Sequence, residues 1–287
     1  MAIVQTLGVA SCLGGPIRSC GYAAEMLHDE FLRQKTEQPG LQLQWHMVYP
    51  GNHRSKQKKL AKLNQSISRF THYWTEQNHT FLVIGGDHSC ALGTWGGVLN
   101  GLRSPDQLGL IWLDAHMDAH TFATSPSGNV HGMPLAALLG KGDKKLAKMY
   151  PGYHFILPKN LVLVGVRSYE QAEYDLLKQA GVEFIFARQI DRLARTLTDV
   201  IDRLSLTCRI IGISIDLDFI DPEDAPGVET PVLKGIKAEQ LLEALTLINR
   251  HPKICGLELC EFNPEKDAQN RTLHLMKDIV EAVYGER

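Results

Sequence analysis

Six side chains of types that commonly bind metal ions lie in three short motifs, and each motif follows an apolar run. The motifs are Gly-Gly-Asp-His at 85–88, Asp-Ala-His-Met-Asp at 114–118 and Asp-Leu-Asp at 216–218. Four carboxylates in one pocket would repel one another unless cations lay between them. An oxygen-rich set with two imidazoles suits manganese better than zinc. The sequence therefore predicts a metal centre with six candidate ligands: His88, Asp114, His116, Asp118, Asp216 and Asp218.

Each motif taken alone has a simpler interpretation. An Asp-x-Asp after a strand is usually a loop or a helix cap, and Gly-Gly-Asp-His is most often a turn. The apolar runs 80–84, 108–113 and 210–215, however, all end in segments that carry acids or histidine. Ligands of α/β sheets bind at the carboxyl ends of strands. The coincidence of three motifs therefore favours one shared site over three unrelated turns.

The segments Gly-Gly-Asp-His-Ser (85–89), Asp-Ala-His-Met-Asp (114–118) and Ser-Ile-Asp-Leu-Asp (214–218) resemble the signatures of the arginase/agmatinase (ureohydrolase) family, and arginase most closely. The resemblance implies a three-layer α/β/α sandwich around a central, mostly parallel sheet, with two Mn²⁺ ions at one edge. It also implies that Asp114 and Asp216 bridge the two ions. His88 and Asp118 would complete one shell, and His116 and Asp218 the other.

The same resemblance implies a manganese-dependent hydrolase of a linear amidine, most closely one that converts L-arginine to L-ornithine and urea. Two cations would activate a bridging hydroxide, and Asp118 is expected to serve catalysis as well as metal binding. His131 would be a proton shuttle, since the imidazole pKa lies near working pH. Glu261 would bind the guanidinium by charge-assisted hydrogen bonds, with the hydroxyl of Thr230 beside it.

Arginine and agmatine differ by one carboxylate, and several residues bear on the choice. The resemblance implies that a loop with two serines and an asparagine binds the amino-acid end, and that two glutamates receive the α-ammonium group. Two residues depart from the family pattern: His120 replaces an asparagine, and Glu229 replaces a glycine. The expected substrate-binding residues are His120, Ser125, Ser127, Asn129, Glu170, Glu173 and Thr230.

Other functions remain open at this point. The substrate could be agmatine or another guanidino acid. The chain could also be a non-catalytic scaffold stabilised by metal, or a deacetylase-like zinc hydrolase, which needs one metal only. The presence of all six ligands together with His131 and Glu261 favours the binuclear enzyme.

Composition limits the possible partners. The chain has 287 residues, 44% of them hydrophobic, and a net charge of −2. We expect a single domain over 1–287, because the motifs must converge and no linker divides them. The charge balance argues against nucleic acid and membrane as partners, and the basic segment 53–62 is expected to be a solvated helix face. The partner would be a small guanidino molecule, and the family resemblance implies a homo-oligomer, either a trimer or a hexamer.

Six cysteines contain no Cys-x-x-Cys pair, and Cys208, Cys255 and Cys260 lie in or beside apolar runs. They are expected to be reduced in a cytoplasmic protein. Strands are expected at 3–9, 80–84, 108–113, 161–166, 182–186, 210–215 and 254–260, because continuous apolar runs suit a covered parallel sheet. Helices are expected between them, including 169–180, 237–250 and 272–283.

Overall fold

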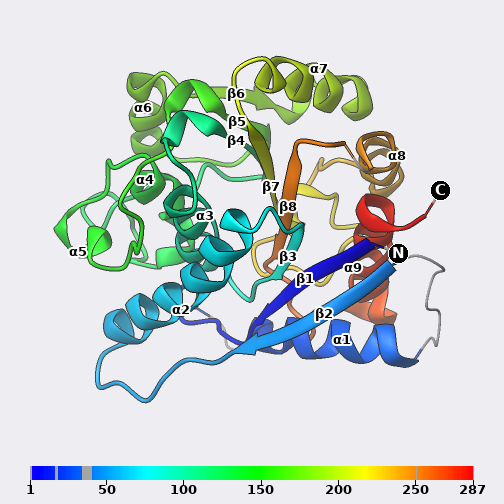
Figure 1. Cartoon of the computed structure of the whole chain (residues 1–287), viewed down its shortest axis with the longest axis horizontal. Coiled ribbons are helices and arrows are strands. Elements are labelled where there is room, and N and C mark those ends of the chain that lie inside the picture. The colour runs from blue at the N-terminus through cyan, green and yellow to red at the C-terminus, as the bar shows by residue number, and fades with distance from the viewer. Residues whose placement is uncertain (1, 17–18, 34–40, 250, 287) are drawn as a thin grey trace.

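A single sheet of eight parallel strands runs through the protein (Figure 1). The computed structural model describes residues 2–16, 19–33, 41–249 and 251–286. The strand order is β2-β1-β3-β8-β7-β4-β5-β6. The strands are β1 (Ala2–Val9), β2 (Leu41–Val48), β3 (Phe81–Ile84), β4 (Leu108–Leu113), β5 (Leu161–Val166), β6 (Glu183–Phe186), β7 (Ile210–Asp216) and β8 (Ile254–Cys260).

Helices cover both faces of the sheet, which confirms the expected three-layer α/β/α sandwich. One core cluster joins the sheet to α1, α7, α8 and α9, and a second joins it to α2, α3, α4 and α6. The helices are α1 (Ala23–Arg33), α2 (Lys56–Glu76), α3 (Ala91–Asn100), α4 (Pro134–Leu138), α5 (Lys144–Ala147), α6 (Gln171–Ala180), α7 (Leu193–Ser205), α8 (Ala238–Ile248) and α9 (Arg271–Tyr284).

The predicted elements agree with the structure except at one edge of the sheet. The expected helices correspond to α6, α8 and α9, with ends shifted by one or two residues; residue 250 lies outside the described part. Lys56, Lys58 and Lys62 are exposed on α2, as the basic segment predicted. Strand β2 was not predicted. It alternates apolar and polar residues because it is an edge strand and mostly half-buried, so it lacks a continuous apolar run.

The strand order places four consecutive strand ends at the site. β3 and β4 are neighbours in sequence, but β8 and β7 lie between them in the sheet. All the strands are parallel, so the carboxyl ends of β3, β8, β7 and β4 meet at one edge, where open α/β sheets bind ligands. The motifs at 85–88, 261, 216–218 and 114–118 follow these four strands in that spatial order.

The cysteines correct the expectation that all six are reduced. Cys12 and Cys20 form a disulfide, with their Cα atoms 5.7 Å apart. Sequence spacing alone does not show this approach. Cys90, Cys208, Cys255 and Cys260 are free, and all but Cys255 are fully buried. Within the described residues, no helix combines the length and apolar character needed to cross a membrane.

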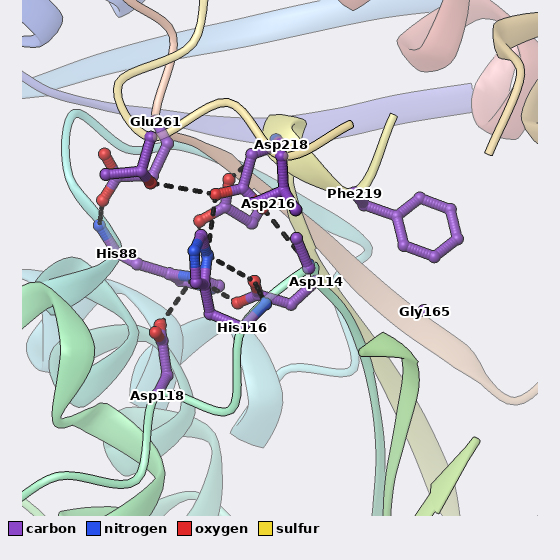
Figure 2. Close-up of polar contacts among 12 residues, drawn as sticks. His88, Asp114, His116, Asp118, Gly165, Asp216, Asp218, Phe219 and Glu261 are labelled. Carbon is purple, nitrogen blue, oxygen red and sulfur yellow. Dashed lines mark hydrogen bonds and ion pairs between the residues drawn. The ribbon is translucent and has the colours of Figure 1, made fainter. Parts of the chain in front are cut away.

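Gly165 in β5 provides a test of how the sheet supports the site. Its φ is +98°, and a Cβ there would overlap the ring of Phe219 and lie 3.2 Å from the carbonyl oxygen of Asp114 (Figure 2). Gly165→Ala should therefore lower the free energy of unfolding by about 2–5 kcal/mol, as the sum of a left-handed backbone and an overpacked core. Denaturant unfolding measures this loss.

Gly181 supplies the matched control. Its φ is +81°, but nothing lies within 4 Å of a Cβ built on it. Gly181→Ala should therefore cost only about 1–2 kcal/mol, from the backbone alone. Equal losses of unfolding free energy in the two variants would show that overlap with Phe219 does not add to the cost of Gly165→Ala.

Candidate metal centre

The first motif follows β3, and Asp87 fixes its loop. The side chain of Asp87 accepts hydrogen bonds from the backbone of Ser89 at 3.0 Å and of Gly14 at 2.8 Å. The second bond ties the loop after β1 to the loop that carries His88. Sequence reasoning did not single out Asp87, although an acid before a short helical turn is a capping signal.

His88 lies among three acids. Its Nδ1 is 3.1 Å from Asp118 Oδ2 and 3.3 Å from Oδ2 of both Asp114 and Asp216. The side chains of all four residues are at least nine-tenths buried. The sheet thus gathers four of the six predicted ligands from the ends of β3, β4 and β7.

His116 and Asp218 lie beside this group and share Asp114 with it (Figure 2). His116 Nδ1 is 2.9 Å from Asp218 Oδ2 and 3.6 Å from Asp114 Oδ1. The two oxygens of Asp114 therefore contact different histidines, which is the position that a bridging carboxylate needs. Asp216 instead belongs with His88 and Cys260 in a third group.

The acids perturb one another strongly. Burial and the charge of Asp114 raise the pKa of Asp118 to about 6. Burial, followed by the charges of Asp218 and Asp114, raises the pKa of Asp216 well above its usual value. Burial also acts on Asp114, but its contacts with His116 and His88 outweigh it and lower its pKa. Cations among these oxygens would remove the repulsion.

The histidines show the opposite balance. Burial alone would lower the pKa of both His88 and His116. The close contacts of its Nδ1 with the carboxylates of Asp114, Asp118 and Asp216 raise the pKa of His88 well above its usual value. The charge of Asp218 and bonds to nearby acids raise that of His116. The raised pKa values favour the protonated form of each imidazole, which supplies positive charge among the carboxylates.

Buried atoms without partners test whether the site fits a metal. In the described part of the chain, His88 Nδ1, Asp118 Oδ2 and Glu261 Oε2 are buried and lack a hydrogen-bond partner. Leaving such an atom unsatisfied costs about 1–3 kcal/mol. His88 Nδ1 and Asp118 Oδ2 are only 3.1 Å apart, and a cation bound to both would satisfy them. Three overlapping groups here could each hold a metal ion.

Glu261 lies at the end of β8 in contact with His131. Its Oε1 accepts the backbone N–H of His88 at 2.7 Å and lies 3.1 Å from His131 Nδ1. Burial would lower the pKa of His131, but the charge of Glu261 and the hydrogen bond to it raise that pKa to about 10. Only Oε2 of Glu261 remains unpaired, so one oxygen rather than two is available to a guanidinium.

A cleft of about 210 Å³ opens beside the ligands. A larger cavity, about 630 Å³, lies near Cys12 and Lys56, but none of the predicted site residues lines it. We therefore place the candidate site in the smaller cleft. It brings together four residues of the metal and proton-transfer sets with every predicted substrate-binding residue: His116, Asp118, Asp216, His131, His120, Ser125, Ser127, Asn129, Glu170, Glu173 and Thr230.

His120 is bonded within the protein on both sides of its ring. Its Nε2 lies 3.0 Å from Glu170 Oε2 and 3.4 Å from Glu173 Oε2, and its Nδ1 lies 3.1 Å from the hydroxyl of Thr124. Burial, together with Glu170, raises the pKa of Glu173 to about 8. His120 thus contacts the acids expected to receive an ammonium group.

Thr230 and Glu229 both form hydrogen bonds to other residues of the protein. The hydroxyl of Thr230 donates to Asp218 Oδ2 at 3.1 Å, so it orients a predicted metal ligand. Glu229, which departs from the family pattern, is buried and accepts a hydrogen bond from Asn263 at 3.0 Å. It does not line the cleft, so it does not meet a substrate carboxylate there.

Two features of the site were not expected from the sequence. The Trp112 indole donates to Asp114 Oδ2 at 2.9 Å, and its ring stacks on His88 with centroids 4.1 Å apart. The two-residue spacing of Trp112 and Asp114 along the strand direction is a signal that could have indicated this contact. Asp118 and Glu261 have φ of 46° and 67°, a left-handed conformation that is uncommon for non-glycine residues and is enriched at functional sites.

Comparisons with known proteins bear on this site. A model of the arginase family matches residues 8–285. The arginase of Bacillus subtilis (strain 168) is 38% identical over 226 residues, covering 78% of this chain and 75% of the relative. The arginase of Brevibacillus brevis is 40% identical over 208 residues, covering 72% and 69%.

Solved structures agree with this match. The arginase of Bacillus cereus superposes with a TM-score of 0.90 at 30% identity, covering 100% of this chain and 99% of the other. The Entamoeba histolytica arginase, solved in complex with L-ornithine, has a TM-score of 0.87 at 25% identity, covering 99% of each chain. The sequence match extends over almost the whole chain and the fold agrees throughout, so this chain belongs to the arginase family.

Proposed function

We propose that the protein hydrolyses L-arginine to L-ornithine and urea and uses two Mn²⁺ ions to do so. The observation that carries the proposal is Glu261 Oε2, a buried carboxylate oxygen without a partner beside the metal-ligand cluster. A guanidinium N–H would satisfy it through a charge-assisted hydrogen bond. The relatives named as arginases, one of them in complex with ornithine, support arginine as the substrate.

The ligand set supports two manganese ions. Two bound cations would supply an activated water by lowering its pKa. We assign His88 and Asp118 to one ion, His116 and Asp218 to the other, and bridging positions to Asp114 and Asp216. The position of Asp114 between the two histidines supports its bridging role. The predominance of carboxylate oxygen over nitrogen supports manganese over zinc.

Residues beyond the ligands would complete the reaction. Glu261 would hold the guanidinium and orient His131 through the same carboxylate. His131, whose pKa is raised to about 10, would carry a proton that it can give to the departing amine. At the far end of the cleft, Glu170 and Glu173 would receive the ammonium group, and the loop with Ser125, Ser127 and Asn129 the carboxylate. His120 would hold Glu170 in place.

The alternatives predict other observations. A scaffold stabilised by metal gives no reason for an unpaired oxygen on Glu261. A hydrolase with a single zinc gives no reason for a second imidazole–carboxylate group around His116. A screen for urea release, with Mn²⁺ present, across arginine, agmatine and other guanidino acids tests the proposal. We expect arginine to give the highest kcat/KM. A higher value for agmatine, or no urea from any guanidine, would overturn it.

Glu261→Gln tests the guanidinium contact. An amide that keeps the bond to the backbone of His88 presents its NH₂ where Oε2 now lies, so it meets the guanidinium with a donor instead of an acceptor. We expect kcat/KM to fall by roughly 10- to 150-fold, the loss of a charge-assisted bond worth about 1.5–3 kcal/mol. The fall should be the same for arginine and agmatine, with metal content unchanged. Loss for one substrate alone would place Glu261 at the other end.

His120→Ala tests the far end of the cleft. Arginine and agmatine share the ammonium group, and His120 contacts the acids that would bind it. We expect kcat/KM for both to fall together by about 2- to 10-fold, the effect of one lost hydrogen bond. Asn129→Ala is the comparison and should weaken arginine more than agmatine. If His120→Ala selectively weakened arginine, His120 would bind the carboxylate itself.

The proposal also covers the oligomeric state, the cellular location and the number of domains. A homo-oligomer, trimeric or hexameric, follows from the family, and light scattering on the purified protein measures it. A cytoplasmic location is supported by four free cysteines and opposed by the disulfide between Cys12 and Cys20. One continuous eight-stranded sheet supports a single domain over 1–287.

A further inference from the structure

The disulfide between Cys12 and Cys20 closes a loop that is bonded to the segment of the proposed proton carrier. Gly14 lies inside this loop, and its carbonyl oxygen accepts the backbone N–H of Val130 at 2.8 Å and that of His131 at 3.3 Å. The place of the His131 backbone beside the site therefore depends on where the loop holds Gly14.

The two cysteines differ in how firmly they are held. Cys20 is 2% exposed, and the hydroxyl of its neighbour Ser19 donates at 2.9 Å to Asn263 Oδ1, just beyond the end of β8. Cys12, by contrast, is half-buried and lies two residues before Gly14. The disulfide thus fastens the mobile-chain side of the loop, with Gly14, to a cysteine that the fold already holds.

A cavity of about 630 Å³ gives access to this disulfide. Cys12 lines the cavity, and so do Lys56 and Lys59 of α2. Thiol–disulfide exchange begins when a thiolate attacks one sulfur of a disulfide. The two ammonium groups favour the approach of such an anion. Glu25 also lines the cavity, but its carboxylate accepts a hydrogen bond from the hydroxyl of Tyr49 at 3.0 Å.

We propose that the pair Cys12–Cys20 is an exchange site for small dithiols, and that its redox state sets how firmly the His131 segment is held. The consequence for catalysis rests on the proposed function, which assigns proton transfer to His131. The remaining cysteines are free, and a disulfide in a protein whose other thiols stay reduced is usually transient or redox-sensing. These free cysteines are Cys90, Cys208, Cys255 and Cys260.

The exchange passes two electrons from the dithiol to the protein. One thiolate of the dithiol attacks Sγ of Cys12, the S–S bond breaks, and the sulfur of Cys20 leaves as a thiolate that takes up a proton. The second thiolate of the reagent then attacks the reagent's own sulfur in the mixed disulfide. This step releases Cys12, which is also protonated, and leaves the dithiol as a cyclic disulfide. A small-molecule disulfide reverses the exchange and closes the loop again.

Opening the disulfide should loosen the bonds to Gly14. Without the cross-link the loop gains conformational freedom, so the bonds from Val130 and His131 should open more often. Dithiothreitol, applied to the Mn²⁺-loaded full chain and then removed by gel filtration, is the probe. Alkylation with mass spectrometry should find two additional free thiols, on Cys12 and Cys20. Hydrogen exchange in the peptide that contains residues 130–131 should become at least about 10-fold faster.

Urea release from arginine measures the effect on turnover. We expect kcat of the reduced protein to fall by about 3- to 10-fold, less than complete loss of a general acid–base group, because His131 keeps its contact with Glu261. The KM for arginine and the Mn²⁺ content should change by no more than about twofold, since no metal ligand is altered. Oxidised glutathione should restore both the slow hydrogen exchange and the original kcat.

Two variants serve as controls for the reductant. The double variant Cys12→Ser/Cys20→Ser should behave like the reduced protein and should not respond to dithiothreitol. Cys255→Ser should behave like the unmodified protein in both redox states, because Cys255 is a partly exposed free thiol near the start of β8, at the opposite edge of the sheet from the site.

The outcomes separate this inference from the proposed function. It is overturned if Cys12 and Cys20 remain free thiols after treatment with oxidised glutathione, or if dithiothreitol leaves the disulfide intact. An opened disulfide with unchanged exchange at 130–131 and unchanged kcat also overturns it. The same holds if exchange rises throughout the chain in step with a lower melting temperature, because the disulfide would then support the whole fold. If exchange rises at 130–131 but the oxidised protein releases no urea, the loop coupling stands and the proposed function fails.

Discussion

Asp216→Asn should abolish most metal binding and lower arginine hydrolysis by more than about 100-fold. Loss of a partner behind a metal ligand already costs 10- to 100-fold, so loss of a ligand's charge should cost more. The metal-free protein should keep its stability, because burial and Asp218 raise the pKa of Asp216 well above its usual value and the neutral acid resembles the amide. Elemental analysis, urea release and thermal unfolding measure these three quantities.

The pattern of the three results decides the interpretation. Asp199→Asn, at a largely exposed ion pair on α7, is the control and should leave all three unchanged. If Asp216→Asn retained two metals and normal turnover, Asp216 would not be a ligand. If it lost metal only because the metal-free protein unfolded, the acid would have a structural role that the site geometry does not indicate.

His131→Ala should lower kcat by about 10- to 10⁴-fold, from partial loss of a proton shuttle to loss of a full general acid–base contribution, which is typically 10²–10⁴-fold. Metal content should stay near that of the unmodified protein, because His131 contacts Glu261 and none of the predicted ligands directly. Steady-state urea release on metal-saturated protein gives kcat, and elemental analysis of the same sample gives the metal.

His28→Ala is a suitable control, since His28 lies on α1, makes an edge-to-face contact with Trp45 of β2, and is on neither the motifs nor the strands that carry them. It should leave kcat unchanged. A parallel fall of metal content and kcat in His131→Ala would make His131 a ligand or a support of the ligand loops, and would remove it from proton transfer.

Much of the fold could be predicted from the sequence, because the inner strands β3, β4, β5, β7 and β8 are largely buried and appear as mostly apolar runs. The strand β2 lacks such a run, since it lies at the edge and alternates. The disulfide between Cys12 and Cys20 depends on the approach of the two residues in space, which their spacing in the sequence does not specify.

The site likewise has residues that the sequence predicts and contacts that it does not. The motifs at His88, Asp114 and Asp216 were recognisable because each follows its strand directly, and parallel strands end at a common edge. The partners of these residues were not recognisable. Glu258 lies inside an apolar strand, and its contact with Ser214 arises only because β7 and β8 are neighbours in the sheet. The orientations of His120 and Glu229 likewise depend on packing between distant segments.

The most direct test of the proposed function is a titration of Mn²⁺ into metal-free protein while urea release from L-arginine is measured. If two ions act together among six shared ligands, the rate should rise with added metal and level off at two equivalents per chain. Activity that is complete at one equivalent would contradict the binuclear centre, and no urea at any Mn²⁺ concentration would contradict the proposed reaction itself.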